Sequence, residues 1–160
     1  MNLRALASSV VLLGLLLTAG CAEPVPAQCP VSEPNGSTPP GEPASEMFHG
    51  ENGLWTALWP DGLVAFAPDG PGEIRSDGSL AMKFPWWRAE GVEGDLRISG
   101  RRLHGQAQSL AAEIPPGYGQ RGFQASTLVF PSEGCWEVMA QAGQARLSFV
   151  TEVRQLSATE

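Results

Sequence analysis

Positive charge is scarce in this chain. Its 160 residues include 10 Lys and Arg against 17 Asp and Glu, which gives a formal net charge of −7 at pH 7. A surface this acidic repels phosphate backbones, and the sequence has no Lys/Arg run long enough to form a basic patch. We therefore expect no nucleic-acid partner.

Histidine is also scarce, since His49 and His104 are the only two. Two imidazoles leave few arrangements for acid–base catalysis or for a metal site, and they show no His-x-x-His spacing. The sequence also lacks a Gly-x-Ser-x-Gly nucleophile elbow. We expect no catalytic residue, no metal and no cofactor, and a small extracytoplasmic hydrolase ranks below the other functional hypotheses.

Long hydrophobic runs are absent except at the start, which reads MNLRALASSVVLLGLLLTAGC. One basic residue, an apolar run and small residues in this order are typical of a secretory signal, too short for a spanning helix. The end of the run resembles the lipobox of bacterial lipoproteins, which implies cleavage after residue 20 and acylation of Cys21. An ordinary signal peptide ending near a cysteine is the alternative, and both place the mature protein outside the cytoplasm.

The lipobox resemblance also implies a membrane partner. Several acyl chains on Cys21 would hold the protein on the bilayer, where a single chain binds only marginally. Ala22 follows the cysteine, and in this family a residue other than Asp there permits sorting to an outer membrane, if the cell has one. We therefore expect a protein that is lipid-anchored to the cell envelope.

Proline is concentrated in one segment. Residues 21–46 contain half of the chain's 14 prolines and almost no large apolar residue. Such a segment buries too little surface to offset its ordering entropy, and its prolines favour an extended spacer. We interpret residues 21–46 as a tether and residues 47–157 as the folded domain.

From residue 53 onward, short runs rich in Val, Leu, Phe and Trp are separated by Gly, Pro and Asp-Gly turns. No window has sustained helical spacing of apolar residues, which predicts an all-β domain. Asp-Gly pairs recur every eight residues at positions 61, 69 and 77, a rhythm that predicts successive short antiparallel strands. We also expect separate strands over residues 94–98 and 102–104.

The C-terminal half contains the clearest strand pair. Residues 135–141 and 144–153 alternate apolar and polar side chains on either side of a Gly-containing turn. Trp136 and Val138 then face the core on the first strand, and Leu147 and Phe149 on the second. Strands and turns at this spacing predict an immunoglobulin-like antiparallel β-sandwich.

The same segment, STLVFPSEGCWEVMAQAGQARLSFVTEV, resembles the end of uncharacterised bacterial lipoprotein and secreted domains. They carry a Pro-x-x-Gly-Cys-Trp-x-Val signature before a Gly-turned hairpin, and the likeness extends over residues 53–153. The resemblance implies an immunoglobulin-like fold and an extracytoplasmic location. It implies no catalytic residues.

Three cysteines are too few for a disulfide framework, but they permit one bridge. If Cys21 is acylated, Cys29 and Cys135 remain as an even pair in an oxidising compartment. Because Trp136 faces the core, strand alternation turns Cys135 to the outer side of its sheet. We predict a Cys29–Cys135 disulfide that straps the end of the tether across the sandwich.

Five tryptophans in a chain with a single tyrosine suggest a sugar-binding surface. Trp86 and Trp87 point to opposite sides of a strand, so at most one of them belongs to the core. Arg88 follows directly, and Tyr118 and Arg121 lie in a Gly-rich segment that we interpret as an exposed loop. The candidate ligand contacts are therefore Trp86, Trp87, Arg88, Tyr118 and Arg121.

These features together predict a lipid-anchored envelope protein that acts as a binding or structural module rather than as an enzyme. A carbohydrate-binding module that uses exposed tryptophans is the alternative. The expected partners are the membrane, reached through the lipid anchor, and an envelope protein or a polysaccharide.

Overall fold

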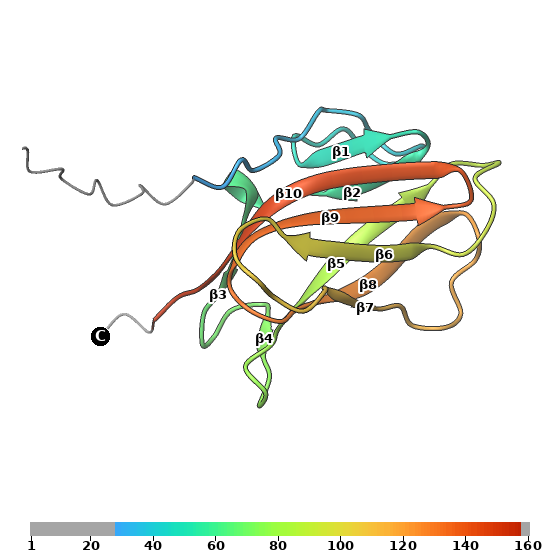
Figure 1. Cartoon of the computed structure of the whole chain (residues 1–160). Helices are drawn as coiled ribbons and strands as arrows, with labels where there is room; N and C mark the ends of the chain where they lie inside the picture. The colour runs from blue at the N-terminus through green and yellow to red at the C-terminus, as the bar shows by residue number, and fades with distance from the viewer. Residues whose placement is uncertain (1–27, 158–160) are drawn as a thin grey trace, which may run out of the picture.

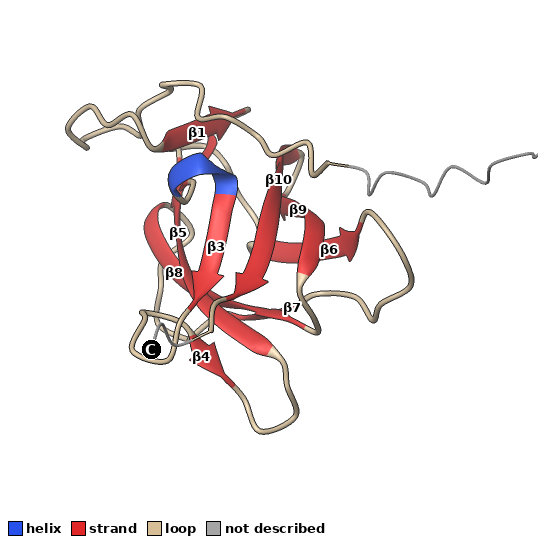
Figure 2. Ribbon diagram, turned by 90° about the vertical axis from the view of Figure 1, so that its left-hand side faces the viewer, coloured by secondary structure: helices blue, strands red, loops and turns tan. Residues whose placement is uncertain are grey.

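The computed structural model describes residues 28–157 as two β-sheets packed face to face (Figures 1 and 2). The predicted signal peptide, residues 1–20, and Cys21 lie outside the described residues. Within them, helical structure is limited to one short 3-10 turn, η1 (Pro60–Gly62). No helix in this range is long and apolar enough to span a bilayer. The prediction of an all-β sandwich is confirmed.

The larger sheet has six strands. Its order is β1-β2-β5-β8-β7, and β4 pairs with the first residues of β5. The strands are β1 (Phe48–Glu51), β2 (Leu54–Ala57), β4 (Glu73–Ile74), β5 (Leu80–Arg88), β7 (Ala111–Glu113) and β8 (Gly122–Phe130). Buried and accessible residues alternate along most of β5 and β8, so one face of this sheet meets the core and the other faces outward. At the start of β5 and the end of β8 both faces are buried.

The smaller sheet has four strands in the order β3-β10-β9-β6. Its strands are β3 (Leu63–Phe66), β6 (Arg97–Arg102), β9 (Gly134–Ala142) and β10 (Ala145–Gln155). The β9–β10 hairpin is the C-terminal strand pair that the sequence predicts. Trp136 lies opposite Thr151 and Val138 opposite Phe149, and all four are buried.

One strand pair departs from the predicted antiparallel arrangement. β3 runs parallel to β10, with Leu63 opposite Glu152 and Phe66 opposite Gln155. The prediction of a purely antiparallel sandwich is therefore wrong for this pair. The reason is that η1 carries the chain from the larger sheet to the smaller one, so β3 joins β10 without a hairpin connection.

Aromatic side chains fill the space between the sheets. Phe84 stacks on Phe149 with ring centroids 5.8 Å apart, and Trp86 lies 6.2 Å from Phe149. The indole Nε1–H of Trp86 donates to the hydroxyl of Ser126 on the neighbouring strand at 2.8 Å. A buried indole with a satisfied N–H contributes a large apolar surface without an unpaired polar group, so Trp86 anchors the core.

The predicted disulfide is present. Cys29 and Cys135 are bridged, with Cα atoms 5.4 Å apart and 106 positions of sequence between them. Trp136, the next residue of β9, is buried in the core, so Cys135 lies on the outer face of the smaller sheet, as alternation predicts. The bridge fixes the segment before β1 to this sheet.

Residues 28–46, which we call the N-terminal strap, pack against the sandwich. Ser32 donates its backbone N–H to the carbonyl of Val150, and its hydroxyl accepts the Val150 N–H, both at 2.9 Å. Further along, the Asn35 side chain both donates to and accepts from the backbone of Gly50. The part of the expected tether from residue 28 to residue 46 therefore contacts the domain that begins at residue 47.

Two predictions of local structure also need correction. The Asp-Gly pairs at 61, 69 and 77 lie in turns, but only the third closes a hairpin, between β4 and β5. An Asp-Gly turn reverses the chain but does not determine which sheet the next strand joins. After the first pair, at residue 61, the chain enters the smaller sheet. The two strands expected over residues 94–98 and 102–104 are instead the single strand β6.

Candidate functional site

An aromatic row crosses the outer face of the larger sheet. The ladder places Trp87 of β5 directly between Trp55 of β2 and Phe123 of β8. Residues opposite each other on adjacent strands share one face, so these three side chains are neighbours. Tyr118, in the loop before β8, extends the row beyond Phe123. The four residues Trp55, Trp87, Tyr118 and Phe123 are called the aromatic row below.

Three rings of the row, those of Trp87, Phe123 and Tyr118, contact one another edge to face. The centroids of Trp87 and Phe123 are 5.4 Å apart with planes at 67°, and those of Tyr118 and Phe123 are 6.1 Å apart at 71°. This geometry is the one that aromatic quadrupoles favour. The row is therefore a connected apolar surface rather than a set of isolated side chains.

Exposure differs along the row. Phe123 is 48% exposed and Tyr118 is 38% exposed, although both are large apolar side chains. Trp55 and Trp87 are half-buried. Connected and exposed apolar side chains on a folded domain mark a contact surface more often than scattered ones do. Phe123 and Tyr118 are the part of the row that a ligand can reach.

The N-terminal strap holds the two indoles of the row in place. Trp87 Nε1–H donates to the Glu42 carboxylate at 3.0 Å, and Trp55 Nε1–H donates to the Ser37 hydroxyl at 2.9 Å. Phe48 also packs edge to face on Trp87, with centroids 5.2 Å apart. These contacts fix the rings before any ligand arrives, which lowers the entropy cost of binding.

Trp55 lies flat on the edge strand because its neighbour there is glycine. A Cβ built on Gly50, which pairs with Trp55 across β1 and β2, would come within 1.9 Å of the indole Cδ1. Any side chain at position 50 would lift the ring away from the sheet. Gly50 therefore supports the flat end of the aromatic row.

One charged side chain, Arg121, lies in the loop beside the row, and another, Lys83, lies farther away along β5 on the same face. On β5, Lys83 is exposed and lies on the same outer face as Trp87, four residues earlier in the strand. In the loop before β8, Arg121 forms an ion pair of 3.0 Å with Glu90, and both side chains are exposed. An apolar strip with hydrogen-bonding groups at its margins can accept a ligand that has both apolar faces and hydroxyl groups.

The five ligand contacts predicted from the sequence lie in different environments in the structure. Trp86 is fully buried and Arg88 is only 4% exposed, so neither contacts a ligand, and this part of the prediction is wrong. Phe123 contacts both Trp87 and Tyr118, and Arg121 lies in the loop that carries Tyr118. Phe123 was missed because its position opposite Trp87 depends on strand register, which the sequence does not give.

Arg88 instead joins two loops at the end of the sandwich. Its guanidinium donates to the carbonyl of Gly94 and to that of Gly119, both at 2.6 Å. Burial lowers the pKa of Arg88, and the charge of Asp95 offsets part of this effect. Arg88 thus holds the loop that carries Tyr118 in position, although it does not reach the surface itself.

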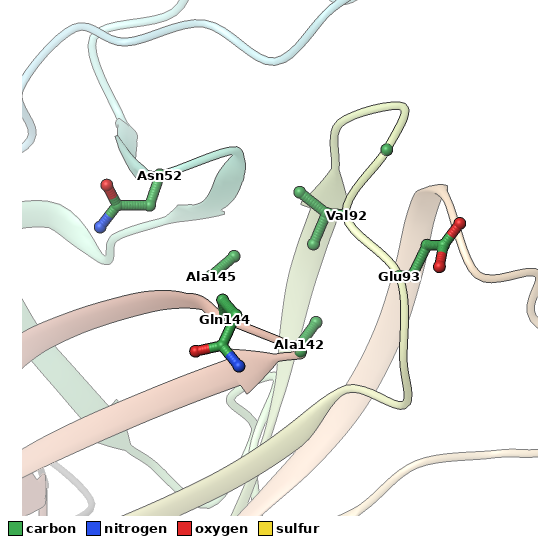
Figure 3. Close-up of a pocket in the computed structure, with 8 residues that line it drawn as sticks. Asn52, Val92, Glu93, Ala142, Gln144 and Ala145 are labelled. Atoms are coloured by element: carbon green, nitrogen blue, oxygen red, sulfur yellow. The ribbon is translucent and has the colours of Figure 1, made fainter.

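The residues that line a pocket at one end of the sandwich do not form a catalytic arrangement (Figure 3). It is bounded by Asn52, by residues 91–93 and by the β9–β10 turn at residues 142–145. Glu93 is its one titratable side chain, and in Figure 3 its carboxylate points away from the other labelled side chains. The Asn52 amide already donates to the Arg146 carbonyl at 3.2 Å. This lining has no nucleophile, and the Glu93 carboxylate has no partner group there with which to act.

Potential metal ligands are dispersed. Among residues 28–157, no three His, Cys, Asp or Glu side chains cluster closely enough to hold an ion. The Nδ1 of His49 lies 3.1 Å from the Glu33 carbonyl, where it secures the strap. His49 is thus explained by a structural contact.

Comparison of the chain with protein-family models, with curated proteins and with solved structures yields no match. The aromatic row and its margins are therefore the basis for the functional proposal.

Proposed function

We propose that the protein is an extracytoplasmic binding module, anchored by a lipid on Cys21, and that its aromatic row binds a carbohydrate chain. The observation that carries this proposal is the connected row formed by Trp87, Phe123 and Tyr118, whose outer members are exposed. The apolar faces of pyranose rings stack on aromatic side chains, and their hydroxyl groups bind polar neighbours such as Lys83 and Arg121.

The spacing of the row supports an extended ligand. Neighbouring strands in a sheet lie about 4.8 Å apart, so Trp87 on β5 and Phe123 on β8 present rings one strand interval apart. A β-linked polysaccharide chain repeats its sugar rings at a similar interval. A chain lying over β8 and the loop before it would then meet Phe123 and Tyr118, with Trp87 behind Phe123.

The disulfide supports the proposed location. Bridges between cysteines persist in oxidising compartments and are rare in the cytosol. A lipid anchor at Cys21 would leave only a few residues before Cys29, where the chain is fixed to the smaller sheet. The folded unit would then lie close to the membrane, with its sheets held by the strap.

Binding to polysaccharides tests the role of the row. We expect purified protein to be retarded in gels containing a soluble β-glucan or solubilised peptidoglycan. Phe123→Ala and Tyr118→Ala should each weaken this retardation at least tenfold. Met139→Ala is the matched control, because Met139 is also 39% exposed but lies on the outer face of the smaller sheet. Equal effects of Phe123→Ala and Met139→Ala, or no retardation of the unmodified protein, would contradict the proposal.

Metabolic labelling with a radioactive fatty acid tests the anchor. The full-length protein should incorporate label and sediment with membranes, whereas Cys21→Ser should do neither. Cys29→Ser controls for a general effect of cysteine replacement, and this variant should still be labelled. An unlabelled, soluble protein would refute the anchor while leaving the carbohydrate site open to its own test.

A further inference from the structure

A second hollow lies at the other end of β5 and β8, away from the aromatic row. A cleft of about 650 Å³ opens between the β4–β5 turn, the loop after β6 and the turn that precedes β9. Its polar lining includes Arg75, Ser79, Arg102, Gln106, Ser109 and Ser132. Two of these side chains, Arg102 and Ser132, have polar atoms without a partner.

Arg102 brings an uncompensated positive charge to this cleft. Its Nε atom is buried and has no hydrogen-bond partner, and the ion pairs found among residues 28–157 do not include this side chain. Arg101, the preceding residue of β6, instead pairs with Glu137 at 2.7 Å. A buried guanidinium donor without an acceptor is costly. The Nε of Arg88 is also unpartnered, but that guanidinium donates to two carbonyls, whereas no hydrogen bond of the Arg102 guanidinium is found among residues 28–157.

Ser132 adds a second unsatisfied group. Its hydroxyl oxygen is buried without a partner, although its carbonyl accepts the indole N–H of Trp136 at 3.0 Å. The carbonyl contact fixes the turn, and the buried hydroxyl beneath the cleft lining has no partner of its own. A serine O–H and an arginine N–H that line one cleft form a donor pair suited to an oxyanion.

Gly134 makes room for this arrangement. A Cβ at position 134 would lie 2.4 Å from Nε and 2.9 Å from Nη2 of Arg102, so the guanidinium rests directly on the glycine backbone. The φ angle of Gly134 is +133°, a conformation that other residues rarely adopt. The glycine of the Pro-x-x-Gly-Cys-Trp-x-Val signature thus permits Arg102 to occupy the cleft.

The other charged groups of the cleft are already engaged. Arg75 makes a two-point contact with the Glu113 carboxylate at 2.9 and 3.0 Å. Asp77 accepts hydrogen bonds from the backbone N–H and the hydroxyl of Ser79 at 2.9 and 2.7 Å. Asp77 remains a negative group at the rim, so a bound anion would lie toward Arg102 and Ser132.

We infer that this cleft binds the oxyanion of a polar ligand, with the anionic group on Arg102 and Ser132. Guanidinium groups recognise carboxylate, sulfate and phosphate oxygens through paired N–H donors. The cleft is far larger than a single ion and falls in the size range of small-molecule sites. Gln106 and Ser109 would then contact hydroxyl groups on the rest of the ligand, as in a sugar phosphate or a uronic acid.

Nuclear magnetic resonance titration of the 15N-labelled protein tests this inference with four probes. Glucose 1-phosphate, glucuronate and inorganic phosphate carry an oxyanion, whereas glucose does not. We expect saturable shifts of residues around the cleft with at least one of the three anions and none with glucose. The comparison between glucose 1-phosphate and glucuronate identifies the anionic group, and inorganic phosphate shows whether the sugar contributes. No saturable shift with any anion, or equal binding of glucose, would overturn the inference.

Matched variants locate the site. Arg102→Gln should weaken anion binding at least tenfold, and Ser132→Ala should weaken it about threefold. Arg101→Gln removes the same charge one residue away and should leave affinity within twofold. Equal losses in Arg101→Gln and Arg102→Gln would show that net charge alone drives binding, which refutes a built site. Ser132→Ala serves as the decisive variant if Arg102→Gln fails to fold.

Discussion

Trp86 and Trp87 are consecutive residues of β5, yet they belong to two different regions of the molecule. Trp86 lies between the sheets, fully buried, with its N–H bound to Ser126. Trp87 lies on the outer face, half-buried, with its N–H bound to Glu42 of the strap. Strand alternation alone assigns one indole to the core and the other to the aromatic row.

Aromatic residues of the larger sheet therefore have two roles: those on the inner face pack in the core, and those on the outer face form an accessible surface. Inner aromatic side chains such as Phe84 and Trp86 contact aromatic rings of the opposite sheet, so their loss opens a cavity. Phe123, on the outer face, contacts its neighbours at ring edges and leaves apolar surface accessible to other molecules. Substitution of inner residues should reduce stability, and substitution of outer residues should reduce binding.

The largest effect is expected for Trp86→Ala. Removal of this indole leaves a cavity beside Phe84 and Phe149 and deprives Ser126 of its partner. We expect the free energy of unfolding to fall by about 3 to 5 kcal/mol, as for other large-to-small core substitutions. Urea denaturation followed by circular dichroism measures this loss. A decrease below 1 kcal/mol would mean that Trp86 does not anchor the core.

Loss of the disulfide should have the next largest effect. The double variant Cys29→Ser, Cys135→Ser removes a link that closes a long loop, so its free energy of unfolding should fall by about 2 to 4 kcal/mol. Release of the strap should also free the N–H groups of Trp55 and Trp87, and indole emission should shift to longer wavelength. Unchanged emission would show that the strap holds the aromatic row without the bridge.

A smaller effect is expected for Trp87→Ala. Its ring is half-buried and makes edge contacts with Phe48 and Phe123, so we expect a loss of about 1 to 2 kcal/mol. Polysaccharide retardation should also fall in this variant, because Phe123 loses the ring that it packs against. The comparison with Trp86→Ala is decisive, because an equal loss of stability in both variants would abolish the distinction between the two faces.

Much of the fold follows from local patterns in the sequence. Alternation over residues 135–141 and 144–153 predicts the β9–β10 hairpin and the burial of Trp136, because a strand with one covered face must repeat every two residues. The pairing of Cys29 with Cys135 follows from the expectation that Cys21 is acylated and that the compartment is oxidising. The parallel contact of β3 with β10 does not follow, since it joins segments about 90 residues apart and no local signal encodes it.

The candidate site was predicted only in part, for the same reason. Trp87 and Tyr118 are conspicuous in the sequence, and alternation already separates Trp86 from Trp87. Phe123 enters the row only through the register of β5 and β8, which sets Trp87 opposite it. The burial of Arg88 depends on two loops that close over it, and composition gives no sign of that closure.

The smallest effect is expected from an ion pair of the larger sheet. Arg75 follows β4 and holds Glu113 of β7, and its hydrogen bonds lower the pKa of that carboxyl. A carboxyl with a lowered pKa in the folded state contributes stability above its unfolded pKa. That contribution is lost as pH falls through the lower, folded value.

Substitution of Glu113 by Gln should therefore reduce the fall in stability below the ordinary Glu pKa of about 4.3. Glu51→Gln is the control, since Glu51 forms no ion pair with residues 28–157 and should leave the acid dependence unchanged. Asp77 also has a lowered pKa, through its hydrogen bonds from Ser79, but it is present in both variants and cancels in the comparison. The measurement is the urea midpoint from pH 7 downward. Identical curves for Glu113→Gln and Glu51→Gln would show that this exposed pair adds nothing to stability, as many surface ion pairs do not.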